Sequence, residues 1–171
     1  MTKNVQEIEF AGLIKEHELL IFKVCRVYAY TNQDRQDLFQ EIMIQLWKSF
    51  PGFNRQSKFS TWLYKVAIYT AIAGLRKQKN FIHSTEPENL PNTTEDIGYD
   101  STRDEQLIEL FKAIEQLNEI EKAIIMLYLE DKSYEEMEEI LGINQGNLRV
   151  KMNRIKDKLR QLTKNNFYGT G

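Results

Sequence analysis

Cysteine is almost absent from this chain of 171 residues, which contains a single one, Cys25. One cysteine excludes an internal disulfide framework and fits a reducing compartment. The chain has only two histidines, His17 and His83, so it also offers too few Cys and His ligands for a structural zinc site. We therefore expect no metal and no cofactor.

Long apolar runs and catalytic motifs are missing as well. No stretch approaches the roughly 18 residues that cross a bilayer, and MTKNVQEIEF lacks the layout of a signal peptide, which predicts a cytoplasmic protein. The sequence has no Gly-rich phosphate loop, no paired His–carboxylate metal motif and no Ser-His-Asp set. Cys25 and His17 are a poor nucleophile pair, because a buried thiol is the simpler interpretation. We expect no enzyme and no catalytic residue.

Proline is rare, and its three positions, Pro51, Pro87 and Pro91, divide the chain. Segment 81–105, FIHSTEPENLPNTTEDIGYDSTRDE, combines two of them with many Ser, Thr, Asn and acidic residues, which predicts a flexible linker. As coil it would span about 25–30 Å, so the flanking blocks need not touch. The expectation is an all-α protein with two small helical domains, 1–80 and 106–171, joined by the flexible acidic linker 81–105.

The formal net charge of −2 hides a segregation of charge along the chain. Residues 1–80 hold twelve Lys and Arg against seven Asp and Glu, whereas 81–105 hold only Arg103 against seven acidic residues. Residues 144–164 hold seven cations against Asp157 alone. Two basic zones are thus separated by an acidic spacer, a pattern that bears on partners and not on fold.

The first block has the apolar spacing of helices. Between about Val5 and Tyr30 the expected core stripe is Leu13, Leu20, Val24 and Val27. A second helix is predicted from an Asp34 cap to Phe50, with a stripe of Leu38, Ile42, Leu46 and Phe50. Pro51 and Gly52 end that helix, and Ser57 is expected to cap a third one over roughly 58–80.

The second block is also predicted to be helical throughout. Helices are expected over Leu107–Leu117 and Glu119–Glu130, although the run AIIMLYL in the latter also fits a buried strand. Ser133 and Glu136 have the spacing of a capping box that opens a short helix to Leu141, and Gly142 supplies a left-handed exit. Asn144 then caps a last helix whose stripe is Leu148, Met152, Ile155, Leu159 and Leu162.

The short capped helix, the Gly142 turn and the basic helix that follows predict a helix-turn-helix. The apolar stripe would dock the last helix and leave its opposite face to enter a major groove about 12 Å wide. Arg can bond guanine twice, Asn and Gln can do so with adenine, and Lys suits phosphate or guanine. The candidate contacts are Gln145, Asn147, Arg149, Lys151 and Arg154. The alternative is a solvated bundle face without a partner.

The third predicted helix carries cations interleaved with aromatics on one side: Lys58, Trp62, Lys65, Tyr69, Arg76 and Lys79. Unpaired bases stack on exposed rings while Lys and Arg hold phosphates. The alternative is that Trp62 and Tyr69 belong to the core. A second face could be buried in their place, formed by Val66, Ala67, Thr70 and Ala73.

Three stretches resemble extracytoplasmic-function (ECF) RNA polymerase sigma factors. DRQDLFQEIMIQLWKSFPGF (34–53) and FSTWLYKVAIYTAIAGLRKQKN (59–80) are similar to region 2 of the family. LFKAIEQLNEIEKAIIMLYLEDKSYEEMEEILGINQGNLRVKMNRIKDKLR (110–160) is similar to region 4. The resemblance covers most of the chain and implies a sigma factor that directs promoter-specific initiation by core RNA polymerase. A self-contained helix-turn-helix transcriptional regulator is the alternative, but it explains only the second block.

The resemblance also implies partners and roles. The second helix would bind the clamp helices of the polymerase's largest subunit through Asp37, Leu38, Gln40, Glu41, Ile44 and Trp47. The loop from Gly52 to Lys58 and the third helix would recognise and open the promoter −10 element, and region 4 would read the −35 element as duplex DNA. An anti-sigma factor is a further family expectation, and membrane insertion is not expected.

Three positions in the DNA-reading segments implied by the resemblance differ from the residues frequent in the family. Tyr69 stands where members often have Asn, and Ala73 where they often have Asp. At the start of the last helix, Gly146-Asn147-Leu148 replaces the frequent Glu-Thr-Val.

Overall fold

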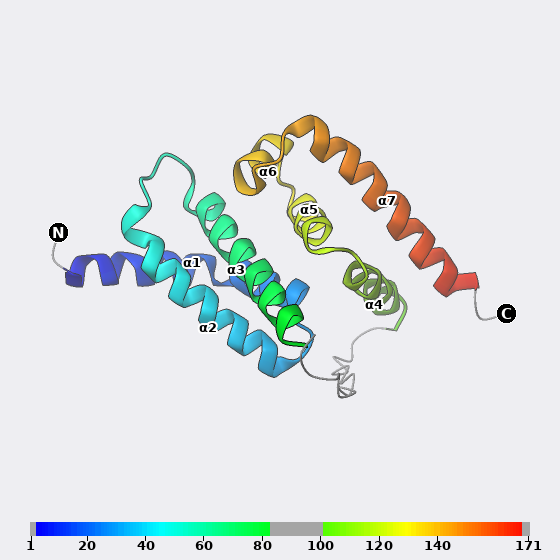
Figure 1. Cartoon of the computed structure of the whole chain (residues 1–171), viewed down its shortest axis with the longest axis horizontal. Coiled ribbons are helices and arrows are strands. Elements are labelled where there is room, and N and C mark those ends of the chain that lie inside the picture. Colours follow the sequence, from blue (N-terminus) through cyan, green and yellow to red (C-terminus); the bar gives the residue numbers. More distant parts are fainter. Residues whose placement is uncertain (1–2, 83–100, 169–171) are drawn as a thin grey trace. The chain divides into compact units, whose positions relative to one another are not determined.

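The computed structural model describes residues 3–82 and 101–168, and every regular element in these ranges is a helix. The chain divides into two compact units, a first unit with α1 to α3 and a second unit with α4 to α7 (Figure 1). The prediction of an all-α protein made of small helical domains is confirmed. No helix in the described ranges combines the length and apolarity that crossing a bilayer demands.

The first unit consists of α1 (Lys3–Tyr28), α2 (Asn32–Ser49), the short 3₁₀ turn η1 (Phe50–Gly52) and α3 (Phe59–Ile82). Each of the three long helices packs against the other two. Their shared core is formed by fully buried side chains: Ile21, Val24, Ile42, Leu46, Leu63, Tyr64 and Ala67. The predicted stripe is confirmed at Ile42 and Leu46 of α2 and at Phe50, the first residue of η1, while Leu38 is half-buried.

Two predicted details of the first unit are wrong. On α1 only Val24 of the expected stripe is buried, because the neighbouring row with Ile14 and Ile21 faces α2 and α3. On α3 the suggested second face is buried only at Ala67, whereas Ala73 is exposed.

The starts of α2 and α3 also differ from expectation. Thr31, not Asp34, caps α2, since its extended backbone places Oγ1 3.1 Å from the Asp34 N–H that donates to it. Asp34 instead lies in the first turn, where a carboxylate suits the helix dipole. Because α3 begins at Phe59, Lys58 precedes its first residue, and Ser57 lies one residue farther away.

An aromatic cluster fixes the loop between η1 and α3. Phe53 lies 5.2 Å from Trp62 between ring centroids, and Phe59 lies 5.4 Å from Trp62. His17 on α1 contacts Phe59 at 4.9 Å, which joins the loop to α1. Arg55, in the left-handed region with φ of 60°, forms an ion pair with Glu9 of α1. The loop therefore has one defined path along the first unit.

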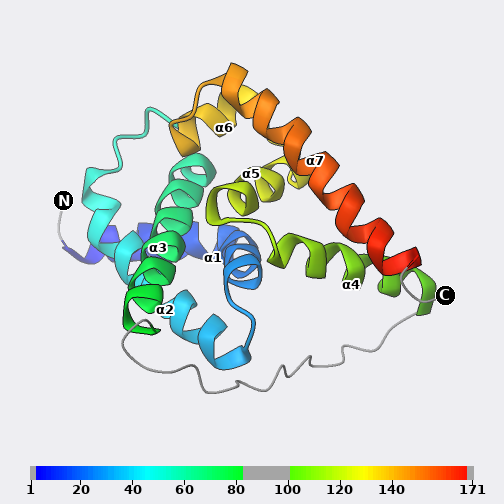
Figure 2. The same cartoon turned by 45° about the vertical axis from the view of Figure 1, so that its right-hand side comes forward.

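The second unit consists of α4 (Ser101–Glu115), α5 (Glu119–Leu129), α6 (Tyr134–Leu141) and α7 (Gln145–Tyr168). The long helix α7 packs against the other three (Figures 1 and 2). Helix α4 begins six residues before the predicted Leu107, so its first turns fall within the segment 81–105 that was expected to be linker. Residues 81–82 of that segment belong to the end of α3, and residues 83–100 lie outside the described residues. The run AIIMLYL is helical, and Ala123 to Leu127 within it are buried.

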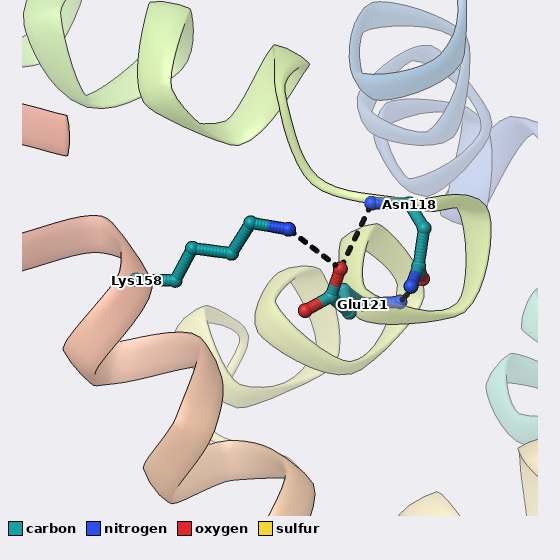
Figure 3. A network of polar contacts seen from close by, with 3 residues as sticks. All are labelled: Asn118, Glu121 and Lys158. Carbon is teal, nitrogen blue, oxygen red and sulfur yellow. Dashed lines mark hydrogen bonds and ion pairs between the residues drawn. The ribbon is translucent and has the colours of Figure 1, made fainter. Parts of the chain in front are cut away.

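Side-chain caps set the helix starts in the second unit. The Ser133–Glu136 capping box, the left-handed Gly142 (φ 71°) and the Asn144 cap of α7 are all confirmed. A second capping box, which the sequence reasoning missed, joins Asn118 to Glu121 at the start of α5. Glu121 Oε1 accepts from the Asn118 N–H at 3.0 Å and from Lys158 Nζ at 3.3 Å (Figure 3). Lys158 thus ties α7 to the start of α5.

Candidate nucleic-acid interface

The outer face of α7 stands opposite a buried stripe. Leu148, Met152, Ile155 and Leu159 are buried against the rest of the second unit, as predicted, and Leu162 is half-buried. Of the predicted contact residues, Gln145 is half-buried, and the other four are exposed: Asn147, Arg149, Lys151 and Arg154. A helix advances about 100° per residue, so Asn147, Lys151 and Arg154 share one flank of this face. Arg149 lies on the other flank.

Sequence reasoning missed Val150, which is 50% exposed at the centre of that face. The methyl of thymine is a partner for apolar side chains in the major groove, which makes Val150 a further candidate contact. The signal was present in the sequence, because Val150 lies outside the apolar stripe of α7.

Arg149 contacts the ring of Tyr134, the first residue of α6. The Arg149 Cζ lies 4.9 Å from the ring centroid, within the range of a cation–π interaction. No carboxylate in the described part of the second unit forms an ion pair with Arg149. A second pair joins Lys156 to the ring of Tyr128 at 4.6 Å.

The exposed side of α3 carries the predicted cations and aromatics in one stripe. At about 100° per residue, Trp62, Lys65, Tyr69 and Arg76 fall within about 60° of one another. Tyr69 is 50% exposed, so the alternative that it belongs to the core is wrong. Trp62 is half-buried in the aromatic cluster, and Lys65 and Arg76 are exposed. Lys58 is exposed just before the helix, and the side chain of Lys79 lies outside those that the structure describes.

A hollow of about 500 Å³ opens beside this stripe, between α2 and α3. Its α3 wall consists of Trp62, Lys65, Val66, Tyr69 and Thr70. The sequence reasoning missed its other wall, formed by Gln45 and Ser49 of α2 and by Gly52, because these residues join α3 only through the tertiary packing. Rings, a cation and amide or hydroxyl groups together suit a planar polar ligand such as an unpaired base.

The outward face of α2 combines acidic and apolar side chains. Asp37 accepts a hydrogen bond from Gln33 Nε2, and Glu41 accepts one from Gln45 Nε2, both at 3.0 Å. Ile44 lies on the same face and is 47% exposed, so it does not belong to the core. Gln40 and Trp47 lie on the same side of the helix, with the Trp47 ring 5.1 Å from Phe10. Leu38 is the exception to this exposure, since it is half-buried and lies on the side of the helix that carries the buried Ile42.

The described residues show neither an activated nucleophile nor a cluster of metal ligands. Cys25 is buried, and this burial raises the pKa of its thiol to about 11, so the reactive thiolate is scarce at neutral pH. Within 3–82 and 101–168 no three His, Cys, Asp or Glu side chains come together as a metal site would require.

Comparisons with known proteins match both units. The family model for sigma-70 region 2 matches residues 13–81, and that for sigma-70 region 4 matches residues 107–159. The chain is 26% identical to the ECF RNA polymerase sigma factor SigW of Bacillus subtilis, over 93% of this chain and 91% of that protein. It is 29% identical to the ECF sigma-E factor of Haemophilus influenzae, over 75% and 74% of the two chains.

A solved structure has the same fold. The sigma factor RpoE of Bartonella quintana, crystallised with the anti-sigma factor NepR, superposes with a TM-score of 0.73 at 18% identity, over 91% of this chain and 97% of that one. Two sigma-70 regions in this order, with the exposed surfaces described above, define a promoter-directed transcription initiation factor. The chain belongs to the ECF family of RNA polymerase sigma factors. The self-contained regulator is not favoured, because the first unit matches region 2.

Proposed function

We propose that the two units divide promoter recognition between them while core RNA polymerase carries out the chemistry. The exposed α3 stripe, with Trp62, Lys65, Tyr69 and Arg76, binds the opened non-template strand of the −10 element. Lys58 and Lys79, which precede Trp62 and follow Arg76 in the sequence, extend this contact. The adjacent hollow receives a base that has left the stack, because an unpaired base offers both a face and a polar edge.

The outer face of α7 reads the −35 element in the major groove. Arg149 bonds a guanine, while Asn147, Lys151 and Arg154 contact bases and phosphates from the opposite flank. Gln145, at the start of the helix, lies near the DNA backbone, where the positive end of the helix dipole also attracts phosphate. Val150 between the flanks contacts a thymine methyl.

The outward face of α2 binds the clamp of the polymerase. Ile44 and Trp47 provide the apolar centre that interfaces favour, Gln40 adds a polar group beside them, and Asp37 and Glu41 form an acidic rim. Leu38 supports this face from its edge. We place the protein in the cytoplasm with the polymerase, and we propose that an anti-sigma factor is its regulatory partner, because a structural neighbour was solved with one.

The observation that carries this proposal is the exposed basic face of α7, opposite its buried apolar stripe, in a chain that also matches sigma-70 region 2. The test is transcription by holoenzyme reconstituted from this chain and core polymerase on a promoter library. We expect promoter-specific transcripts whose −35 preference relaxes in Arg149→Ala, with binding to core polymerase unchanged. Arg160→Ala is the matched control, since Arg160 is exposed on the same helix and paired with Asp157. Unchanged −35 preference in Arg149→Ala would contradict the assignment of α7.

A further inference from the structure

The pair formed by Tyr134 and Arg149 joins the two helices of the helix-turn-helix. Tyr134 is the first residue of α6 and Arg149 the fifth of α7. The backbone on the Tyr134 side is fixed by the Ser133–Glu136 capping box, whose two hydrogen bonds measure 2.9 and 3.1 Å. The backbone on the Arg149 side is fixed by the Asn144 cap, with a 2.8 Å hydrogen bond. Both side chains therefore extend from well-defined positions.

The ring restrains Arg149 without using up its hydrogen-bonding capacity. A guanidinium has five N–H donors, and a cation–π contact occupies none of them in a conventional hydrogen bond. A carboxylate in the place of the ring would take two of the donors that a guanine needs. An unrestrained Arg side chain, in contrast, loses rotamer freedom when it binds a base. The ring thus lowers that loss and leaves the donors available.

We infer that Tyr134 is a positioning residue that holds the Arg149 guanidinium ready for a guanine of the −35 element. The inference rests on the proposed function of Arg149 and adds a side chain that belongs to the other helix of the motif. Tyr134 itself needs no base contact for this role. Its effect on recognition acts through Arg149.

The experiment measures base discrimination by the reconstituted holoenzyme. Transcription from the selected promoter is compared with that from promoters substituted at each −35 base pair, and the pair read by Arg149 is the one whose substitution no longer matters in Arg149→Ala. At that pair, Tyr134→Leu is expected to lower discrimination by about two- to fivefold, the usual effect of an exposed cation–π contact. Tyr134→Phe keeps the ring and is expected to keep the discrimination. Tyr128→Leu, which removes the ring beneath Lys156, is the matched control.

A double-mutant cycle separates positioning from a structural role. The cycle is read from transcription of the unsubstituted promoter, which Tyr134→Leu is expected to lower in the wild-type background and to leave unchanged in the Arg149→Ala background. An equal loss in both backgrounds, or no loss in either, overturns the inference. If Arg149→Ala changes discrimination at no base pair, the proposed function of Arg149 fails, and the inference fails with it.

A second measurement does not depend on the stability of the Tyr134→Leu variant. In the wild-type full chain, the Arg149 side-chain protons should show an upfield ring-current shift by NMR, because the guanidinium carbon lies over the ring. The same shift is expected in Tyr134→Phe. Arg149 protons at ordinary shifts in both proteins would overturn the inference.

Discussion

Lys158 donates a hydrogen bond to a carboxylate oxygen of Glu121 that also accepts one from the backbone. Glu121 Oε1 accepts the Asn118 N–H that closes the capping box of α5, and Lys158 Nζ lies 3.3 Å from the same oxygen. The pair links the last helix, which carries the proposed −35 face, to the start of α5. The ammonium is partly exposed, with 45% of the Lys158 side chain accessible, so water screens its contribution.

Removing the two partners should therefore have unequal effects. Glu121→Ala is expected to destabilise the second unit by about 1 kcal/mol, because the capping box is lost together with the ion pair. Lys158→Met keeps the cap and should cost less than about 0.5 kcal/mol. Urea unfolding measures the free energy of unfolding of the two variants. Equal decreases would show that the capping box does not contribute more than the ion pair.

Gly142 occupies a backbone conformation that disfavours any side chain with a Cβ. Its φ of 71° predicts that Gly142→Ala lowers the free energy of unfolding by about 1 kcal/mol, although nothing lies within 4 Å of the added carbon. Gly12 is the matched control, since it lies within α1 with equally open space. There, alanine should raise helix stability by about 0.5–1 kcal/mol. Thermal unfolding of both variants should give shifts of opposite sign.

The buried thiol of Cys25 gives a pH-dependent prediction. Burial raises its pKa from 9.0 to about 11, and the nearby Arg35 offsets only part of that rise. The stability linked to the neutral thiol is therefore complete below about pH 9 and is lost as the pH rises through 11. At pH 8 the native thiol should react with iodoacetamide roughly a hundredfold more slowly than the unfolded one. Equal labelling rates with and without urea would show that Cys25 is accessible.

Ile44 should contribute to polymerase binding without contributing to the fold. Because its side chain is 47% exposed, Ile44→Ser is expected to leave the unfolding temperature unchanged. Loss of a central apolar contact should weaken binding to core polymerase about tenfold. Ile8→Ser is the control, since Ile8 is 68% exposed on α1, away from the proposed interface. Competition against a labelled sigma factor measures both affinities.

Tyr69 should matter for promoter opening because its exposed ring can stack on an unpaired base. Tyr69→Ala is expected to reduce open-complex formation by about tenfold, as base–ring stacking is worth about 1–3 kcal/mol. Tyr69→Phe keeps the ring and should behave like the wild type. Permanganate reactivity of −10 thymines reports opening. A normal open complex in Tyr69→Ala would remove Tyr69 from the −10 surface.

Features that depend on residues close in sequence were predictable from the sequence. The Ser133–Glu136 box, the Gly142 exit and the Asn144 cap each involve partners within about one helical turn. Asn118 and Glu121 have the same spacing, so this box was detectable and was overlooked. The choice between Thr31 and Asp34 was harder, because both residue types cap helices and only the backbone conformation of Thr31 decides between them.

Features that depend on tertiary packing were not predictable in the same way. Helix α1 has two adjacent apolar rows, and only the positions of α2 and α3 determine that Ile14 and Ile21 are buried rather than Leu13 and Leu20. The α2 wall of the hollow and the contact of Tyr134 with Arg149 join residues that no local pattern connects. The resemblance supplied the family, but the geometry of the candidate site required the structure.

The cap at Asn144 has a consequence for how promoter preference can change. Because this cap and the buried row starting at Leu148 set where α7 begins and how it is rotated, substitutions at 147, 149, 150, 151 or 154 change the chemistry offered to DNA without turning the helix. New preferences can therefore be acquired, or engineered, one exposed position at a time on an unaltered scaffold.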